Sequence, residues 1–396
     1  MLMTFIKNKV FGRINSNRNA DEKRSRKPYN TSFRQQRLKA WYPILSPQSV
    51  LPLLLLIAGI FAPIGIGLLL SAANVQDLVI DYTECDALTV SSNFEQISPE
   101  YTSYHFKKGV FNKPMWRLTQ TGEAEYKCQI QFEVPNDVSS PIYIYYKLTN
   151  YYQNHREYVD SIDIDQLKGK AKSSDDLLEE CDPLREIDGK AVYPCGLIAN
   201  SMFNDTFRNE LIGVGGTTIF RLTNKETAWS TDRHRYKKTS YNASDIVPPP
   251  NWVKMFPNGY TEDNIPDLQS WEEFQIWMRP AALPSFYKLA LKNETSTLRK
   301  GQYLMEIGLN YPVKSFQGTK SFVLTTNSIM GARNIFLGIL YLILAGIAII
   351  FSLIFFIKII IKPKVAGDHE CLNYNSKISH INSSTEHNDA SVRKIL

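Results

Sequence analysis

Few residues in this sequence have the types and the spacing that catalysis requires. The six histidines form no His-Glu-x-x-His zinc motif, and the sequence contains no Gly-x-Ser-x-Gly elbow, Cys-x-x-Cys pair or P-loop. The run GVGG at 213–216 lacks the Lys-Ser/Thr that completes a phosphate loop. The paired carboxylates at 179–180 and 272–273 are adjacent, and adjacent helix positions do not face each other. The sequence therefore predicts no catalytic, cofactor or metal site.

One acidic cluster keeps an enzymatic alternative open. Asp160, Asp163 and Asp165 lie in the run DSIDID, which lacks the Gly and the final Glu of a calcium-binding loop. Asp163 and Asp165 also match, loosely, the Asp-x-Asp pattern of metal-dependent glycan transferases. A membrane-anchored lumenal enzyme is therefore an alternative hypothesis.

Two long apolar segments predict that the chain crosses a membrane twice. No charged residue occurs between Ala40 and Gln76, and the segment 335–357 is 23 uncharged residues long. A helix of about 23 residues rises about 35 Å, which is enough for a hydrocarbon layer of about 30 Å. We expect transmembrane helices at 50–73 and 335–357. Neither contains an Asp, Glu, Lys, Arg or His, which disfavours the second alternative, a two-span ligand-gated channel subunit.

The distribution of charge predicts the orientation of the spans. Residues 1–49 carry 11 Lys and Arg against 2 Asp and Glu, whereas residues 74–334 carry 28 against 33. Basic residues next to a membrane mark its cytosolic side. We therefore expect cytosolic tails at 1–49 and 358–396 and a lumenal or extracellular ectodomain at 74–334. The net charge of +6 is therefore explained by the orientation of the chain in the membrane, and no nucleic-acid partner is predicted.

The basic N-terminal tail has two possible roles. Between residues 13 and 39 it is rich in Lys and Arg, and aromatic residues follow at 41 and 42. It either binds anionic lipid on the cytosolic surface or only enforces the topology.

Cysteines and glycosylation sequons agree with this topology. Cys85, Cys128, Cys181 and Cys195 all lie in the predicted ectodomain, where disulfides can form. Four cysteines allow three pairings, of which we favour the nearest-neighbour one. Cys371 lies alone in the predicted cytosolic tail.

Asn-x-Ser/Thr sequons occur inside and outside the ectodomain. Those of Asn204, Asn242 and Asn293 are predicted to be lumenal and to carry N-linked glycans. Those of Asn30 and Asn382 are predicted to be cytosolic and bare.

The ectodomain pattern predicts one β-rich α+β domain of about 260 residues with antiparallel sheets. The expected strands, which are β-branched or aromatic and end at turn residues, are 128–134, 142–149, 217–222, 303–311 and 319–326. The capping box Ser270–Glu273 predicts a helix over 271–279, and a short helix is expected at 175–180.

Several segments resemble a known family. They are FRQQRLKAW at 33–41, ILSP at 44–47, PIGIG at 63–67, NYYQNHR at 150–156, PCGLIANSMFND at 194–205, WMRPAALP at 277–284, NYPV at 310–313 and NIFLG at 334–338. In this order they resemble the accessory β-subunits of phospholipid flippases, the cell-division-control / ligand-effect-modulator family. The four ectodomain cysteines look like the fungal form.

The resemblance implies a non-catalytic function. Such subunits pair with a type IV P-type ATPase, which supplies the ATP and Mg²⁺ chemistry and moves phospholipid from the lumenal or outer leaflet to the cytosolic one. The accessory chain is needed for exit from the endoplasmic reticulum toward the Golgi, endosomes or plasma membrane. It holds no cofactor and contacts its partner and membrane lipid.

Charged, polar and aromatic members of these segments are the candidate partner contacts. They are Arg34, Arg37, Trp41, Asn154, His155, Arg156, Phe203, Trp277 and Arg279.

Overall fold

The computed structural model describes residues 28–39, 46–122, 125–216, 218–327 and 333–361. The chain divides into two compact units: one contains the residues up to Leu54 and from Phe351 onward, and the other is Leu55–Ile350. Trp41, Cys371 and most of the two predicted tails lie outside the described residues. The roles predicted for them therefore stay predictions.

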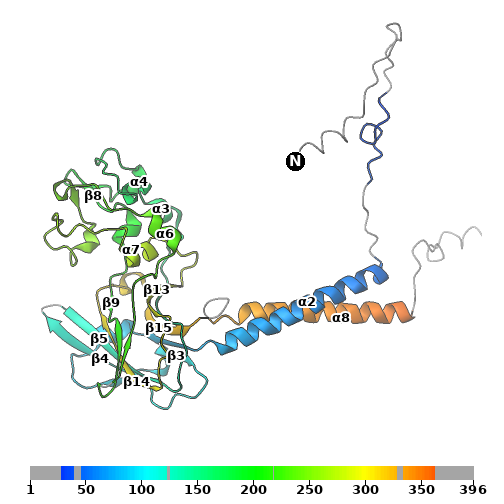
Figure 1. Ribbon diagram of the computed structural model, residues 1–396, viewed down its shortest axis with the longest axis horizontal. Coiled ribbons are helices and arrows are strands. Elements are labelled where there is room, and N and C mark those ends of the chain that lie inside the picture. Colours follow the sequence, from blue (N-terminus) through cyan, green and yellow to red (C-terminus); the bar gives the residue numbers. More distant parts are fainter. Residues whose placement is uncertain (1–27, 40–45, 123–124, 217, 328–332, 362–396) are drawn as a thin grey trace, which may run out of the picture. The chain divides into compact units, whose positions relative to one another are not determined.

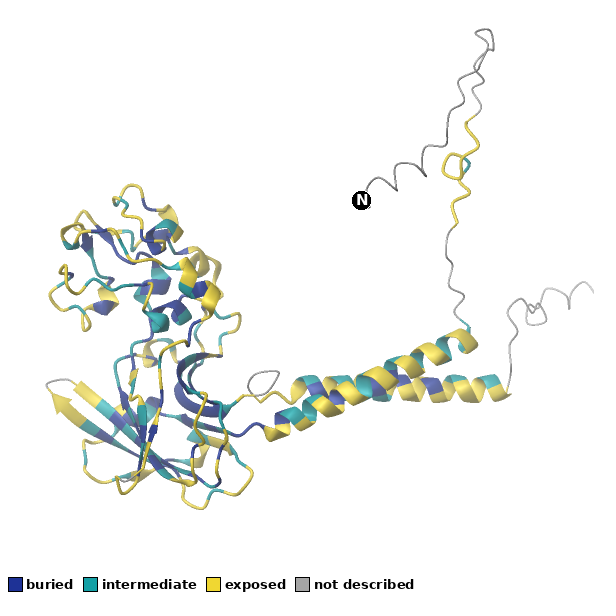
Figure 2. Cartoon of the chain, in the orientation of Figure 1, coloured by how far each residue is buried: buried dark blue, intermediate teal, exposed yellow. Residues whose placement is uncertain are grey.

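The two predicted spans are the longest helices of the described chain, α2 (Pro47–Asn74) and α8 (Phe336–Ile361) (Figure 1). Each is long and apolar enough to cross a membrane. Most of their side chains are exposed (Figure 2), as lipid-facing helices require. The prediction of two spans is confirmed; α2 extends beyond its predicted bounds at both ends, and α8 extends beyond them only at its C-terminal end.

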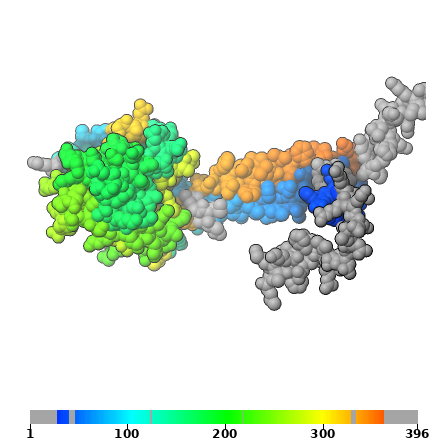
Figure 3. All heavy atoms as spheres, turned by 90° about the horizontal axis from the view of Figure 1, so that it is seen from above, coloured from blue at the N-terminus to red at the C-terminus, as the bar shows by residue number. Residues whose placement is uncertain are grey.

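Glycines let α2 and α8 approach each other closely. A Cβ added at Gly65 would lie 2.9 Å from Leu342 Cγ, and one added at Gly338 would lie 2.8 Å from Leu69 Cγ. Figures 1 and 3 both show the two helices side by side. Because lipid supplies no hydrophobic force between helices, association depends on such close packing. A larger residue at either glycine would force the helices apart.

Two antiparallel sheets contain most of the described strands of the ectodomain. The first has the order β13 (Phe286–Asn293), β6 (Ile142–Leu148), β15 (Lys320–Thr326), β1 (Asp77–Asp81) and β3 (Thr102–His105). The second has the order β11 (Ile219–Arg221), β10 (Glu210–Gly213), β14 (Gly301–Gly308), β5 (Glu125–Val134), β4 (Met115–Gly122) and β2 (Glu95–Gln96), and β9 (Thr206–Phe207) also pairs with β14.

Part of the hydrophobic core lies between these sheets. Buried and half-buried residues alternate along β6 and most of β5, as expected when one face of a strand is covered. Strand β15 is buried along nearly its whole length. It lies between β6 and β1, and its Phe322 ring packs 5.6 Å from the Phe132 ring of β5 in the other sheet.

The remaining elements are short. Five α-helices are α3 (Arg156–Asp160), α4 (Ile164–Leu167), α5 (Leu197–Asn200), α6 (Ser230–Arg235) and α7 (Glu272–Trp277). A small sheet has the order β12 (Ile246–Val247), β8 (Lys190–Val192) and β7 (Glu186–Ile187). The 3₁₀ helices are Thr83–Ala87, Pro99–Tyr101, Glu179–Cys181, Ala243–Asp245, Pro250–Trp252 and Lys314–Phe316. Figure 1 shows α3, α4, α6, α7 and β8 gathered in one region of the ectodomain.

The predicted β-rich α+β class with antiparallel sheets is confirmed, and β5, β6, β11, β14 and β15 match the predicted strands. The prediction of a capping box is wrong, because α7 begins at Glu272 and the Ser270 hydroxyl donates to the carbonyl and carboxylate of Asp267. The prediction of a helix at 175–180 is also wrong, because only the 3₁₀ turn Glu179–Cys181 forms there.

Two disulfides tie the ectodomain together, Cys85–Cys128 and Cys181–Cys195, which is the nearest-neighbour pairing. The first joins the 3₁₀ turn after β1 to strand β5 of the other sheet. The second closes the chain between α4 and α5.

A buried ion pair joins four distant segments. Asp205 and Lys320 are almost fully buried, and their side chains meet at 2.7 Å. The Tyr82 hydroxyl donates to Asp205 Oδ2 (3.0 Å), and the amides of Asn310 and Tyr311 donate to Oδ1 (2.5 and 2.7 Å). Lys320 also donates to the carbonyl of Tyr311 (2.9 Å). Both charges are satisfied, so the network fixes these segments relative to each other.

We predict that Asp205→Ala lowers the free energy of unfolding by about 3–5 kcal/mol, because it leaves the Lys320 charge buried without its carboxylate. Urea unfolding of the purified full chain measures the loss. The control is Asp86→Ala, which removes an exposed ion pair with Lys314 (2.8 Å) and should cost no more than about 1 kcal/mol. Equal losses in the two variants would contradict the prediction.

Candidate functional site

A groove of about 470 Å³ lies among the short helices of the ectodomain. Its apolar lining residues are Val159, Ile162, Ile164, Leu167, Ile198, Met278 and Pro280. Its charged lining residues are Lys168, Asp232, Arg235 and Arg279, and Tyr236 and Gln275 complete it. An apolar floor with a charged rim is a common form of binding site.

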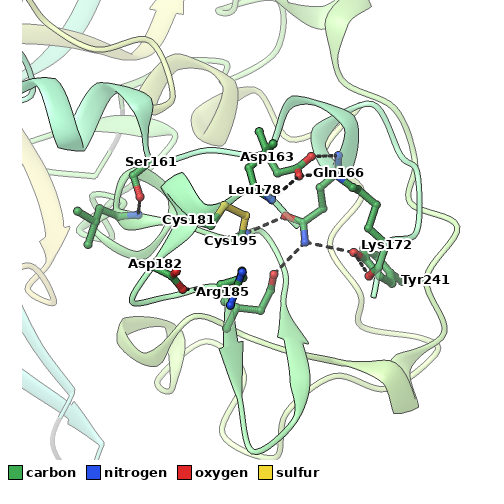
Figure 4. The surroundings of a disulfide bond; sticks show 12 residues. Ser161, Asp163, Gln166, Lys172, Leu178, Cys181, Asp182, Arg185, Cys195 and Tyr241 are labelled. Carbon is green, nitrogen blue, oxygen red and sulfur yellow. Dashed lines mark hydrogen bonds and ion pairs between the residues drawn. A yellow bond between two sulfur atoms is a disulfide. The ribbon is translucent and has the colours of Figure 1, made fainter. Parts of the chain in front are cut away.

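A disulfide and a buried glutamine fix one wall of the groove (Figure 4). Gln166 of α4 is fully buried, donates to the carbonyl of Val192 (2.9 Å) and accepts from the amide of Cys195 (2.8 Å). Cys195 is in turn bonded to Cys181. The Ser161 hydroxyl accepts from the amide of Leu197 at 2.9 Å. The residues from 161 to 167 are therefore fixed before any ligand arrives.

A buried lysine fixes the end of α7, after which Met278 and Arg279 line the groove. Lys288 of β13 is only 7% exposed, and its ammonium donates to the carbonyls of Ile276 (2.9 Å), Trp277 (3.3 Å) and Arg279 at the end of α7. A cation at a helix C-terminus satisfies carbonyls that lack partners within the helix. Burial first, and then the charge of Arg279, lower the pKa of Lys288 to about 7.

The loop before α6 is held to the N-terminus of α7. One Glu272 carboxylate oxygen accepts from the amide of Glu226 (2.8 Å) and the other from the amide of Ala228 (2.7 Å). Glu273 accepts from the side chain of Asn224 at 2.7 Å. These bonds bring α6, with Asp232 and Arg235, to the edge of the groove.

The rim carries a prominent cation. The Arg279 guanidinium lies 3.2 Å from Asp232 and 4.0 Å from the centre of the Trp229 ring, which is 67% exposed. Arg235 also pairs with Asp232, at 3.9 Å. The rim therefore presents more positive than negative charge, with an exposed aromatic ring beside it.

One polar group in the groove is incompletely satisfied. Gln275 is 1% exposed, and its Nε2 donates to the carbonyls of Leu268 (2.8 Å) and Gln269 (3.0 Å). Its Oε1 has no hydrogen-bond partner among the described residues. Buried acceptors are normally paired, so this oxygen is an exception within the wall of the groove.

Four predicted contact residues lie on or near this surface. Arg279 lines the groove. Asn154 donates to the carbonyl of Ala282 (3.0 Å), and His155 precedes α3. Arg156 begins α3, and its side chain is 94% exposed and 3.7 Å from Asp160. The structure thus brings segments near 155 and 280 together, although their partner contacts stay predictions.

Phe203 and Trp277, the other two predicted contact residues of the ectodomain, lie in its core, and their partner contacts stay predictions. Trp277 is fully buried, and its indole N–H donates to the carbonyl of Ile198 at 2.8 Å. Phe203 is 7% exposed and stacks on Tyr146 with ring centres 3.9 Å apart. Both are core residues, because their large apolar surfaces are covered from within the ectodomain.

Two of the three predicted N-terminal contacts, Arg34 and Arg37, lie in the segment 28–39. Arg34 lies over the Tyr29 ring at 5.0 Å, and the Arg37 side chain hydrogen-bonds that of Asn30. Both arginines belong to a short exposed stretch that includes a turn.

The acidic pair of the enzymatic alternative has local partners. Asp163 is buried and accepts from Lys172 (2.7 Å) and from the amides of Gln166 (2.9 Å) and Leu178 (3.3 Å). Burial alone would raise the pKa of Asp163, but these hydrogen bonds outweigh it and lower the pKa. Asp165 lies 3.1 Å from Lys170. Within the described residues, no cluster of three or more His, Cys, Asp or Glu could hold a metal ion.

The three predicted glycosylation sites lie in different settings. Asn242 is exposed and bonds Asp245 at 3.3 Å. Asn293 ends β13 and donates to the carbonyl of Arg221 at 2.7 Å. Asn204 is half-buried beside the Asp205 network.

These features define a two-span integral membrane protein with a disulfide-bonded, β-rich ectodomain. The chain belongs to the LEM3 (ligand-effect modulator 3) family / CDC50 family, whose model matches residues 68–365. This confirms the resemblance inferred from the sequence.

Relatives match nearly the whole chain. "Phospholipid-transporting ATPase accessory subunit CRF1" of Saccharomyces cerevisiae is 61% identical over 383 residues, covering 96% of this chain and 95% of that protein. "Phospholipid-transporting ATPase accessory subunit LEM3" of the same organism is 42% identical, covering 89% and 88%. "Cell cycle control protein 50A" of Bos taurus is 37% identical, covering 84% and 88%.

Sequence reasoning missed several residues that build the groove. Lys288, Gln275 and Asp232 are polar residues in strands or helices, and nothing in their spacing shows that they are buried or that Gln275 and Asp232 line one cavity. The one available signal was the run DRHRYKK at 232–238, whose charge density beside Trp229 marks a basic surface.

We predict that Lys288 makes stability depend on pH. Because its folded pKa of about 7 lies below its unfolded value, the unfolded chain binds more protons between pH 7 and pH 10. The free energy of unfolding should therefore rise with pH in this range, by up to about 1.4 kcal/mol per unit. Denaturant unfolding at pH 7, 8 and 9, compared with Lys288→Met, isolates this slope; identical slopes in both proteins would contradict it.

Proposed function

We propose that this chain is the non-catalytic accessory subunit of a phospholipid-transporting P-type ATPase and forms a heterodimer with the catalytic subunit. The observation that carries the proposal is the 61% identity, over 96% of this chain, to a protein named as such a subunit. ATP hydrolysis and Mg²⁺ binding belong to the partner. This chain is needed for the exit of the partner from the endoplasmic reticulum and for moving lipid toward the cytosolic leaflet.

We further propose that both termini are cytosolic and that the ectodomain lies in the lumen or outside the cell, along the route from the endoplasmic reticulum to the Golgi, endosomes or plasma membrane. The excess of basic residues in 1–49 supports this orientation. The two disulfides support an oxidising compartment for the ectodomain. N-linked glycans on Asn204, Asn242 and Asn293 belong to the same proposal.

The groove is the proposed docking site for a lumenal segment of the catalytic subunit. Its apolar floor suits an apolar side chain, and its Arg279 and Arg235 rim suits a neighbouring carboxylate. A short peptide segment with an apolar and an acidic residue would satisfy both.

The two alternatives have less support. An Asp-x-Asp enzyme would need Asp163 free to bind a metal ion, whereas this carboxylate is held by Lys172 and two backbone amides. A channel subunit would need polar groups along its spans, and the sequences of α2 and α8 are almost entirely apolar.

Deleting this chain from cells should trap the catalytic subunit in the endoplasmic reticulum and lower the uptake of labelled phosphatidylserine or phosphatidylethanolamine. Fluorescence microscopy of the tagged ATPase and a lipid-uptake assay measure the two effects. Restoring the full chain is the control. An ATPase that leaves the endoplasmic reticulum and transports lipid normally without this chain would disprove the proposal.

Reversing the rim charge should weaken the complex. Arg279→Glu places a carboxylate beside Asp232, so we expect the catalytic subunit recovered by co-purification to fall by about tenfold or more. Arg299→Glu is the matched control, because Arg299 also forms a surface ion pair, with Asp137 at 3.1 Å. Equal recovery from the two variants would exclude the groove as the docking site.

A further inference from the structure

A loop of the ectodomain, residues 106–114, lies where the first span ends. Helix α2 ends at Asn74, and β1 begins at Asp77. Strand β3 is antiparallel to β1, with His105 paired with Asp77, so β3 runs back toward the end of α2. In Figure 1, β3 lies beside this end of α2. The loop that follows β3 is therefore at the level at which the chain leaves the membrane.

Polar side chains hold the start of this loop to the end of the span. The His105 ring Nε2 lies 3.2 Å from the carbonyl oxygen of Ala73, in the last turn of α2. The amide of Lys107 donates to the side-chain oxygen of Gln76 at 3.3 Å. The Asn136 side chain donates to the same oxygen at 2.7 Å. These contacts set the position of the loop relative to α2.

A carboxylate fixes the tip of the loop. One oxygen of Glu133, on β5, accepts from the amides of Phe111 (3.0 Å) and Asn112 (2.5 Å). The amide of Lys108 donates to the side chain of Asn136 at 3.3 Å. Because these backbone groups are paired within the ectodomain, the loop keeps its shape while its side chains remain exposed.

The ring of Phe111 is left uncovered by the rest of the chain. It is 86% exposed, more than any other large apolar side chain of the described residues, including those of α2 and α8. Single exposed apolar residues are common on protein surfaces, so exposure alone assigns no role. Phe111 differs because it lies beside the end of a membrane span, where apolar and aromatic side chains enter the lipid.

The loop is also positively charged. Lys107, Lys108 and Lys113 are exposed, and none of the three forms an ion pair within the part of the chain that the structure describes. The loop contains no Asp or Glu. Unpaired cations around an exposed apolar ring fit a phospholipid surface, because its phosphate oxygens accept N–H donors and its acyl chains surround the ring.

We propose that the loop 106–114 anchors the ectodomain to the membrane surface. Phe111 enters the leaflet in which α2 ends, and Lys107, Lys108 and Lys113 bind the phosphate groups of its lipids. The ectodomain thereby contacts the bilayer at a point beside its two spans. Because the ladder of β1 and β3 joins the loop to the first sheet, this contact orients the sheet relative to the membrane. The inference depends on α2 as a span and not on the proposed catalytic partner.

Quenching of tryptophan fluorescence by bromolipid tests the contact. The full chain is placed in nanodiscs of phosphatidylcholine and phosphatidylserine, with or without bromine on the upper part of the acyl chains. The emission that Phe111→Trp adds to that of the unmodified protein should fall about twofold or more with the bromolipid, because the indole lies within the leaflet.

Tyr152→Trp is the matched control. Tyr152 is 58% exposed and follows β6. The start of β6, at Ile142, pairs with Thr326, whose amide donates to a carbonyl in the segment between α2 and β1. Tyr152 lies beyond the opposite end of this strand, so the emission that it adds should not change with the bromolipid. Unquenched emission from Phe111→Trp, or equal quenching at both positions, would overturn the proposal.

Charge reversal tests the lysines and separates lipid from protein. Lys107→Glu with Lys108→Glu, in the Phe111→Trp protein, should reduce the quenching by about half or more at low salt. Lys237→Glu with Lys238→Glu changes another exposed, adjacent pair by the same charge and should not reduce it. In the complex with the catalytic subunit, the quenching should persist. Quenching that the Lys107 and Lys108 changes do not reduce would contradict the proposal, and so would quenching that the catalytic subunit abolishes by covering the loop.

Discussion

The buried ion pair between Asp205 and Lys320 is the interaction on which the ectodomain depends most. Two charges can be buried together only when hydrogen bonds satisfy the remaining lone pairs and protons, and here Tyr82 and two backbone amides do so for the carboxylate. These groups come from four separate parts of the chain. The network therefore specifies one relative placement of β1, β15 and the loops before β9 and after β14. The aromatic side chains of the core then pack against segments whose relative positions this network fixes.

Two further buried polar groups act in the same way where the short helices gather. Gln166 connects α4 to the segment that carries Cys195, and Lys288 binds the carbonyls at the end of α7. Each satisfies backbone groups that a loop-rich region would otherwise leave unpaired. The groove between these elements is therefore formed in advance. Such a preformed site loses little conformational entropy when a partner binds.

The architecture fits a protein that acts by contact. Its spans pack against each other through Gly65 and Gly338, and the ectodomain presents a groove with an apolar floor and a basic rim. A disulfide-tied ectodomain joined to a helix pair is well suited to binding a larger membrane enzyme.

The sequence alone determined the features that depend on composition and local periodicity. Long uncharged runs fixed the two spans, alternation marked β5 and β6, and cysteine spacing favoured the pairing that the structure has. Family resemblance located the segments near 155, 200 and 280. It could not separate surface from core, because a matched motif contains both, and Trp277 proved to be buried while Arg279, two residues later, is exposed.

Only the tertiary structure decided the roles of the polar residues. Ser270 and Glu273 have the spacing of a capping box, but Asp267 and Asn224 compete for the two side chains. In the sequence, Asp163 resembles a metal ligand. In the structure, Lys172, which is nine residues further along the chain, lies 2.7 Å from its carboxylate. Asp205 and Lys320 are 115 positions apart and have no pattern that connects them. Such partners are brought together by the pairing of strands and the packing of sheets, which local sequence does not encode.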